Sequence, residues 1–90
     1  MQKLITNTCN ELKEFLILKN KAYGNSVLNP ICIFSKLNSL EQINVRIDDK
    51  ISRIARGHDY DEEDTELDLI GYLILKRILH KKKKETKKCL

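Results

Sequence analysis

The sequence predicts an all-α protein, a small antiparallel bundle of three long helices and one short helix. Apolar residues recur every three to four positions in three segments, which is the spacing of one face of an α-helix. The chain has one proline and three glycines, and it carries no β-hairpin signal. Because 90 residues bury only a modest apolar surface in a monomer, we expect the protein to form a homo-oligomer.

The first helix is predicted by an apolar row that includes Leu12 and Leu16. Residues 6–8 offer side chains for an N-cap, and Gly24 offers the left-handed backbone that commonly ends a helix. A short helix is expected over residues 30–34, because this segment begins with a proline, which suits the first helical turn.

The second and third helices have clearer boundaries. Residues 39–42, Ser-Leu-Glu-Gln, form a capping box that predicts Ser39 as the N-cap, and Gly57 ends the second helix. The third helix is expected from about Glu62 to Lys83. Its apolar residues cover more than half of its circumference, so we expect it at the centre of the bundle or at a subunit interface.

Residues 1–80 are predicted to form one helical domain, and residues 81–90 form a basic C-terminal tail. The net charge is +4, but residues 76–90 carry +7 and the rest of the chain carries −3. The tail either binds phosphates or is a solvated helix end. No apolar run has the length of a membrane span, so no membrane partner is expected. Three widely spaced cysteines form no zinc motif and are expected to be reduced thiols of a cytoplasmic protein.

One polar face interrupts the apolar third helix. Asp64, Asp68 and Tyr72 follow one another four residues apart. Asp68 lies between apolar neighbours, and a buried carboxylate needs a cation, a metal or several donors. Asp64 is either an N-cap with Asp68 in an ion pair, or both contact a ligand or Mg²⁺. Gly71 costs about 1 kcal/mol against alanine inside a helix, which is tolerable if another backbone or a flat ligand approaches there.

Two further polar groups accompany this face. Arg46, Lys50 and Arg53 form a basic row beside the apolar stripe of the second helix, and Asp49 can orient the guanidinium groups. The row either neutralises phosphates or forms ordinary ion pairs. The stretch KNKAYGNS, residues 19–26, supplies two lysines, an aromatic ring and neutral donors at the end of the first helix. It suits a base stacked on the tyrosine with a phosphate near a lysine, although the helix dipole also accounts for the lysines.

Enzyme signatures are sparse in the sequence. It has no Walker loop, no G-x-G-x-x-G motif and no nucleophile motif near its two histidines. Glu11 and Glu14, with Asp64 and Asp68, could supply the carboxylates of a metal-dependent hydrolase, or the two glutamates could face solvent. We therefore assign no catalytic residue and leave metal binding open.

The motifs K-x-K-x-Y-G-N-S, R-I-D-D-K-I-S-R-I and E-D-T-E-L-D-L-I-G-Y, in this order, resemble those of the nucleotide modification associated domain 1 family of small phage and bacterial proteins. The resemblance covers about residues 14–75 and implies a link to nucleotide metabolism. More distantly, the third helix is similar to that of all-helical MazG-like nucleoside triphosphate pyrophosphohydrolases, where Asp68 would match a metal-binding aspartate. Thr65 stands where those enzymes have a glutamate, which implies binding without hydrolysis.

The residues and the resemblance together predict a phage-type protein that sequesters a nucleotide in the cytoplasm of a bacterial host cell. The expected ligand is a host immune signalling nucleotide, either a cyclic dinucleotide or an ADP-ribose derivative, and the expected site is a pocket at a subunit interface. No cofactor is expected, and nucleic acid is not expected as a partner. The alternatives are a Mg²⁺-dependent nucleotide pyrophosphohydrolase, a nucleotide-modification accessory protein, or a nucleic-acid or protein-binding module that uses the basic tail.

Each candidate ligand-binding residue has an expected role. The lysines and arginines bind phosphates, the tyrosines stack on a base, the aspartates orient cations or contact ribose hydroxyls, and the remaining two are neutral hydrogen-bonding groups. The candidates are Lys19, Lys21, Tyr23, Asn25, Ser26, Arg46, Asp49, Lys50, Arg53, Asp64, Asp68 and Tyr72.

Overall fold

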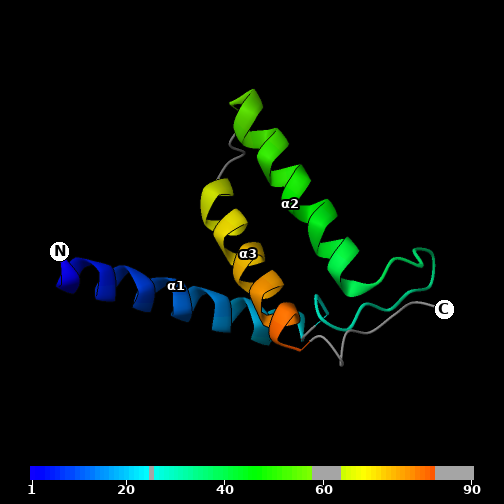
Figure 1. Cartoon of the computed structure of the whole chain (residues 1–90), viewed down its shortest axis with the longest axis horizontal. Coiled ribbons are helices and arrows are strands. Elements are labelled where there is room, and N and C mark those ends of the chain that lie inside the picture. Colours follow the sequence, from blue (N-terminus) through cyan, green and yellow to red (C-terminus); the bar gives the residue numbers. More distant parts are fainter. Residues whose placement is uncertain (25, 58–63, 83–90) are drawn as a thin grey trace.

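The computed structural model describes residues 1–24, 26–57 and 64–82, without the side chain of Tyr23. These residues form three helices and no strand: α1 (Gln2–Tyr23), α2 (Ser39–Arg56) and α3 (Thr65–Lys81). α2 and α3 run antiparallel and pack along each other, whereas α1 crosses the first half of α3, where Leu16 meets Gly71, and its N-terminal end projects away from the pair (Figure 1). The all-α class is confirmed for the described residues.

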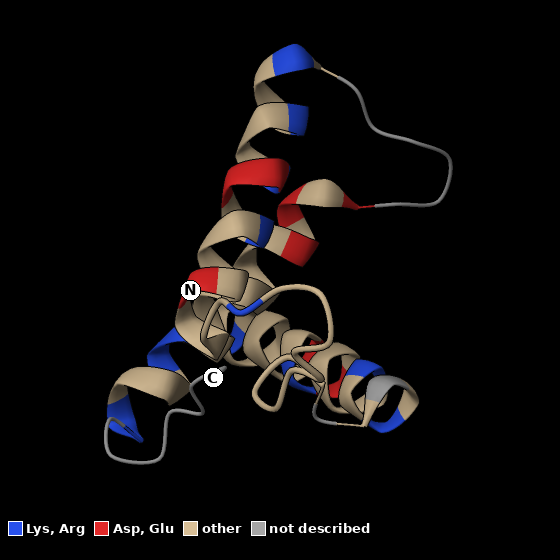
Figure 2. Cartoon of the chain, turned by 90° about the vertical axis from the view of Figure 1, so that its right-hand side faces the viewer, with Lys and Arg blue, Asp and Glu red and all other residues tan. Residues whose placement is uncertain are grey.

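The core lies between α2 and α3. Ile43, Ile47 and Leu79 are buried, and apolar side chains from the loop before α2 pack against them. The predicted stripe of α2 therefore faces the core at its first half. Ile51 and Ile54, farther along the stripe, are 50% and 46% exposed. The reason is that the C-terminal end of α2 extends beyond the start of α3, as both ribbon views show (Figures 1 and 2).

α3 is the central helix, because it contacts both α1 and α2. This confirms one of the two positions that its apolar circumference predicts. The contact with α1 half-buries Leu12, Phe15 and Leu16. On the same face of α1, Leu4 and Ile5 remain 64% and 56% exposed, because this end of the helix projects past α3 (Figure 1).

The boundaries of α1 differ from the prediction at one end. The helix begins at Gln2, so the N-cap expected at residues 6–8 is wrong, and Met1 provides no capping side chain. The predicted end is confirmed, since Gly24 has a φ of 60° and its N–H donates to the carbonyl of Asn20. Glycine is favoured there because it has no Cβ to strain the left-handed backbone.

Side-chain caps begin the other two helices. The N-cap of α2 is Asn38, one residue before the predicted Ser39, and its Oδ1 accepts from the N–H of Glu41 at 2.9 Å. The N-cap of α3 is Asp64, whose Oδ1 accepts from the N–H of Leu67 at 3.0 Å. The capping interpretation of Asp64 is therefore confirmed.

The short helix expected at residues 30–34 is not formed, and this segment is an irregular loop. Cys32 has a φ of 58°, which interrupts a right-handed helix. The loop leaves Ile33 and Phe34 61% and 97% exposed. Cys32 is half-buried and disulfide-bonded, so the expectation of reduced thiols is wrong for this residue, whereas Cys9 is an exposed free thiol.

Charged residues concentrate where α2 ends and α3 begins. Arg53 and Arg56 lie in the last turn of α2, and Glu66 and Asp68 lie in the first turn of α3 (Figure 2). Within the described ranges, no helix combines the length and hydrophobicity that crossing a membrane requires. Of the predicted tail, Lys81 ends α3 and Lys82 caps it, and the rest lies outside the described residues.

Candidate functional site

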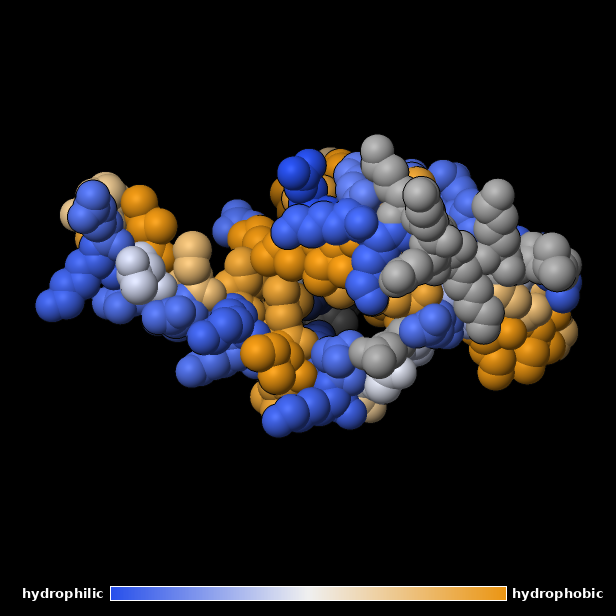
Figure 3. Space-filling view, turned by 60° about the horizontal axis from the view of Figure 1, so that its bottom comes forward, coloured by the Kyte–Doolittle hydropathy of each residue, from blue (hydrophilic) through white to orange (hydrophobic). Residues whose placement is uncertain are grey.

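A pocket of about 720 Å³ lies where α1, α3, the first half of α2 and the loop between α1 and α2 meet. This volume is within the range of about 300–1,000 Å³ that is usual for small-molecule sites. The loop and the helices supply an apolar wall, which includes Phe15, Val27, Ile43 and Leu75. In the space-filling view, hydrophobic surface borders a hollow near the middle of the molecule (Figure 3).

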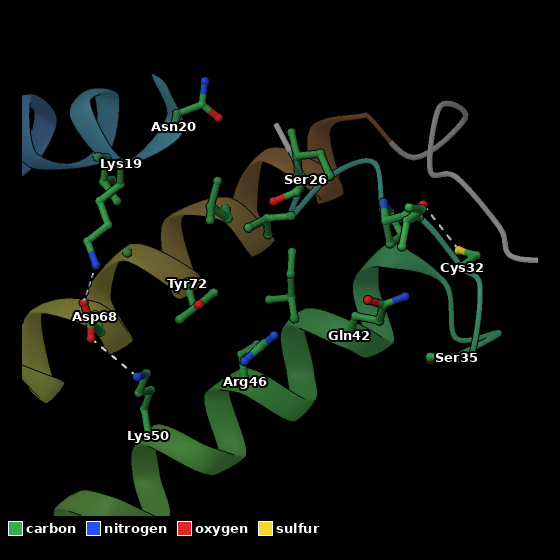
Figure 4. A pocket seen from close by; sticks show the side chains of 18 of the residues that line it. Lys19, Asn20, Ser26, Cys32, Ser35, Gln42, Arg46, Lys50, Asp68 and Tyr72 are labelled. Carbon is green, nitrogen blue, oxygen red and sulfur yellow. Dashed lines mark hydrogen bonds and ion pairs between the residues drawn. The ribbon is translucent and has the colours of Figure 1, made fainter. Parts of the chain in front are cut away.

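The polar end of the pocket is built around Asp68, which lies between two lysines (Figure 4). Its Oδ1 is 3.6 Å from Nζ of Lys19, and its Oδ2 is 3.4 Å from Nζ of Lys50. The side chains of Asp68 and Lys50 are only 14% and 11% exposed, whereas that of Lys19 is 47% exposed. The ion-paired interpretation of Asp68 is confirmed, and its two pairs connect all three helices.

Arg46 and Tyr72 point into the same space (Figure 4). Arg46 lies one turn before Lys50 on α2, is exposed, and has no ion-pair partner among the described residues. Tyr72 lies one turn after Asp68 on α3, and its half-buried ring packs against the core. A guanidinium group can hold a phosphate through two hydrogen bonds, and an aromatic ring offers a flat face to a base.

Gly71 allows α1 to approach α3 closely. A Cβ placed on Gly71 would lie 2.8 Å from Cδ2 of Leu16, which is closer than real Cβ contacts. A close approach at Gly71 is therefore present, but the approaching group is the Leu16 side chain of α1 and not a backbone as the sequence suggested. On the neighbouring turns of α1, the Lys19 ammonium lies 5.1 Å from the centroid of the Phe15 ring, which is within the range of a cation–π interaction.

The structure divides the candidate residues into three groups. Oδ2 of Asp49 lies 3.5 Å from Nε of Arg53 across one turn of α2, so it pairs with one of the two arginines that it was expected to orient, and neither partner lines the pocket. The candidates that line the pocket are Lys19, Ser26, Arg46, Lys50, Asp68 and Tyr72. Those that do not line it are Lys21, Asp49, Arg53 and Asp64. Asn25 and the side chain of Tyr23 lie outside the described residues.

Several pocket residues were missed in the sequence. Gln42 lies four residues before Arg46, so the row Gln42–Arg46–Lys50 faces the pocket instead of the predicted Arg46–Lys50–Arg53 row. The Gln42 side chain donates to the carbonyl of Leu37 at 2.8 Å. Its helical spacing was a usable signal. No sequence pattern indicated that Phe15, Asn20 and the loop residues line the pocket, because they reach it only through the way α1 packs against the other helices.

The carboxylates of the described residues do not gather as a metal site would require. Among the residues that the structure describes, no three His, Cys, Asp or Glu side chains lie together as potential metal ligands. Glu11 and Glu14 are exposed on α1 and do not line the pocket. Both oxygens of Asp68 face lysines.

No family model, curated protein or solved structure matches this chain. The fold and the pocket therefore define its class: an all-α protein in which three helices and a loop enclose a pocket with an apolar wall and a cationic end. Such a pocket suits a ligand that combines a flat or apolar part with an anionic group.

Proposed function

We propose that the pocket binds a nucleotide and that the protein sequesters this nucleotide without converting it. The observation that carries the proposal is the convergence of Lys19, Arg46 and Lys50 on one pocket that also holds the Tyr72 ring. The three cations can bind phosphate oxygens, and the ring and the apolar wall can hold a base. The Asp68 carboxylate keeps acceptor capacity beyond its two lysine pairs, so it can also accept from a ribose hydroxyl.

The proposed ligand is a host immune signalling nucleotide, a cyclic dinucleotide or an ADP-ribose derivative, and the proposed setting is a phage protein that acts against host defence. The volume of about 720 Å³ supports a ligand of this size. The order of the three sequence motifs, which resembles that of the phage and bacterial nucleotide modification associated domain 1 family, is the second support.

Sequestration is favoured over hydrolysis by the surroundings of Asp68. A carboxylate that binds Mg²⁺ normally shares the ion with other oxygen ligands. Here each oxygen of Asp68 faces an ammonium group, at 3.4 and 3.6 Å. This environment suits a counter-ion for lysines better than a ligand for a second cation.

Native mass spectrometry of the full chain tests the proposal. The probes are cyclic di-AMP, ADP-ribose and AMP, followed by denaturation and recovery of the bound compound. We expect at least one probe to be retained and recovered intact, and retention to be lost in Arg46→Met and Lys50→Met. Arg56→Met is the matched control, because Arg56 is an exposed cation of α2 that does not line the pocket.

Three outcomes contradict the proposal. The first is that no probe is retained at millimolar concentration, and the second is that Arg56→Met weakens retention as much as Arg46→Met. The third is recovery of a cleaved nucleotide in the presence of Mg²⁺, which supports the pyrophosphohydrolase. If deleting residues 83–90 abolishes retention while Arg46→Met does not, the basic tail is the binding element.

We also propose that a second copy of the chain covers the projecting end of α1. Met1, Leu4 and Ile5 are 85%, 64% and 56% exposed there, on a helix whose next turns pack against α3. A contiguous apolar surface of this kind commonly marks an interface. Sedimentation velocity should show an oligomer that Ile5→Asp dissociates and that Lys3→Asp, elsewhere on the same exposed turns, preserves. A wild-type monomer at every concentration would contradict this.

A further inference from the structure

The pocket has a defined formal charge. Among the described residues that line it, Lys19, Arg46 and Lys50 are cationic and Asp68 is the single carboxylate, which gives a net formal charge of +2. These charges are placed at one end of a cavity whose remaining walls are largely apolar. A ligand that covers this end of the pocket removes the exposed Arg46 and the 47% exposed Lys19 from water, so the best ligand is one whose negative charge matches this excess.

Asp68 controls both the amount and the position of this charge. Each of its oxygens faces one lysine, Oδ1 at 3.6 Å from Lys19 and Oδ2 at 3.4 Å from Lys50. The carboxylate therefore fixes two ammonium groups that come from different helices. At the same time it places a negative charge, on a side chain that is only 14% exposed, within 3.6 Å of both ammonium groups that would bind a phosphate.

Arg46 is the cation that remains for the ligand alone, because it is exposed and has no ion-pair partner among the described residues. It lies one turn from Lys50 and points into the same space (Figure 4). A phosphate group held between these two side chains receives a guanidinium fork and an ammonium. Further phosphates would add negative charge near Asp68, and the one further cation among the described lining residues, Lys19, already pairs with this carboxylate.

We propose, on the basis of the proposed nucleotide-binding function, that Asp68 is a specificity-determining residue that makes the pocket select nucleotides with two negative charges and reject triphosphates. The class includes a nucleoside monophosphate dianion, a dinucleotide with two phosphodiesters, and a diphosphate diester such as ADP-ribose. These ligands differ in shape, but each carries two negative charges. This charge neutralises the net charge of the described lining residues.

Isothermal titration calorimetry on the full chain tests the inference with cyclic AMP, AMP, ADP and ATP, all of which carry the same base. The buffer is kept above the second phosphate pKa of about 6, so that AMP carries two negative charges. It is also free of Mg²⁺, since a bound metal would lower the charge of ATP. We expect AMP to bind at least tenfold more tightly than ATP.

Two substitutions should move this preference in opposite directions. Asp68→Asn keeps the side-chain shape and removes one negative charge, so the ratio of ATP to AMP affinity should rise about tenfold. Lys19→Met removes one positive charge from a side chain that is 47% exposed, so the fold is preserved and the ratio of cyclic AMP to AMP affinity should rise. Glu66→Gln is the control, because it changes the net charge as Asp68→Asn does, on an exposed residue that does not line the pocket.

The outcomes separate this inference from the function on which it rests. If wild-type protein binds ATP as tightly as AMP, or if Asp68→Asn and Glu66→Gln change the ratio equally, charge selection by Asp68 is wrong and nucleotide binding stands. If Asp68→Asn is unfolded, the shift in Lys19→Met decides the matter. If none of the four nucleotides binds, and cyclic di-AMP and ADP-ribose do not bind either, the proposed function itself is overturned.

Discussion

The α2–α3 pair and α1 contain apolar residues of the same kinds, yet they are held in place differently. The pair encloses Ile43, Ile47 and Leu79, whereas α1 is half-buried along one short stretch and exposed over its N-terminal turns. The pocket lies between these two regions. We therefore expect stability and the proposed ligand binding to depend on different contacts: stability on the core of the pair, and binding on the position of α1, which supplies one wall of the pocket.

The largest effect on stability is expected in the core of the pair. Ile43 is 1% exposed, so Ile43→Ala removes buried carbon atoms and leaves a cavity. The free energy of unfolding should fall by about 2–4 kcal/mol, as measured by urea denaturation followed by circular dichroism. The control is Val45→Ala, two residues away and 54% exposed, for which the loss should stay below about 0.5 kcal/mol. Equal losses would contradict the assignment of the core.

The next effect is expected at Asp68, where the two regions meet. Asp68→Ala leaves the ammonium of Lys50, whose side chain is 11% exposed, without its carboxylate. We expect the free energy of unfolding to fall by about 1–3 kcal/mol, because a buried group has lost its partner. Adding Lys50→Met should recover part of the loss. If the double variant is less stable than Asp68→Ala alone, Lys50 is held by contacts other than this pair.

A smaller effect on stability, with a larger effect on binding, is expected at Gly71. Alanine there would place its Cβ 2.8 Å from Cδ2 of Leu16, so α1 or the Leu16 side chain must move. The higher helix propensity of alanine, worth about 1 kcal/mol, offsets this strain in the free energy of unfolding. The affinity for the best nucleotide should nevertheless fall about tenfold, or about 1.4 kcal/mol, because a wall of the pocket shifts.

A matched second substitution makes the Gly71 test specific. Leu16→Ala in the Gly71→Ala background removes the clashing atoms, so part of the affinity should return. Calorimetry on the three variants measures this coupling between the two residues. Strictly additive losses would show that Gly71 and Leu16 act independently and that the position of α1 does not set the affinity.

The sequence was informative wherever a pattern is local. The period of the apolar residues predicted the three helices, and the left-handed preference of glycine predicted the ends at Gly24 and Gly57. Of the two interpretations that the sequence left open for Asp64 and Asp68, the cap and the ion pair are present in the structure. The residues that determine each helix, helix end and cap lie within one or two turns of each other. The ion pairs of Asp68 are the exception, because their lysines come from other helices.

The rest depends on contacts between distant segments. The prediction of a short helix at residues 30–34 was wrong because Cys32 adopts a left-handed backbone conformation. Nothing about a cysteine in the sequence indicates that conformation. Arg53 has the same residue type and the same helical row as Arg46, but it lies beyond the point where α1 and the loop close the pocket. Periodicity places a residue on a face, and only the packing of α1 decides which turns of that face line the site.

The smallest effect on stability is expected at Lys19. This substitution tests most directly whether α1 and the α2–α3 pair have different roles in stability and binding. Its side chain is 47% exposed, so its ion pair with Asp68 is screened by water, and Lys19→Met should change the free energy of unfolding by less than about 0.5 kcal/mol. The affinity for AMP should fall about tenfold, because the substitution removes a cation of α1 from the pocket. Lys13→Met, on the same helix but outside the pocket, should leave both quantities unchanged. If Lys19→Met destabilises the protein as strongly as Asp68→Ala, then α1 is part of what keeps the chain folded, and stability and binding depend on the same contacts.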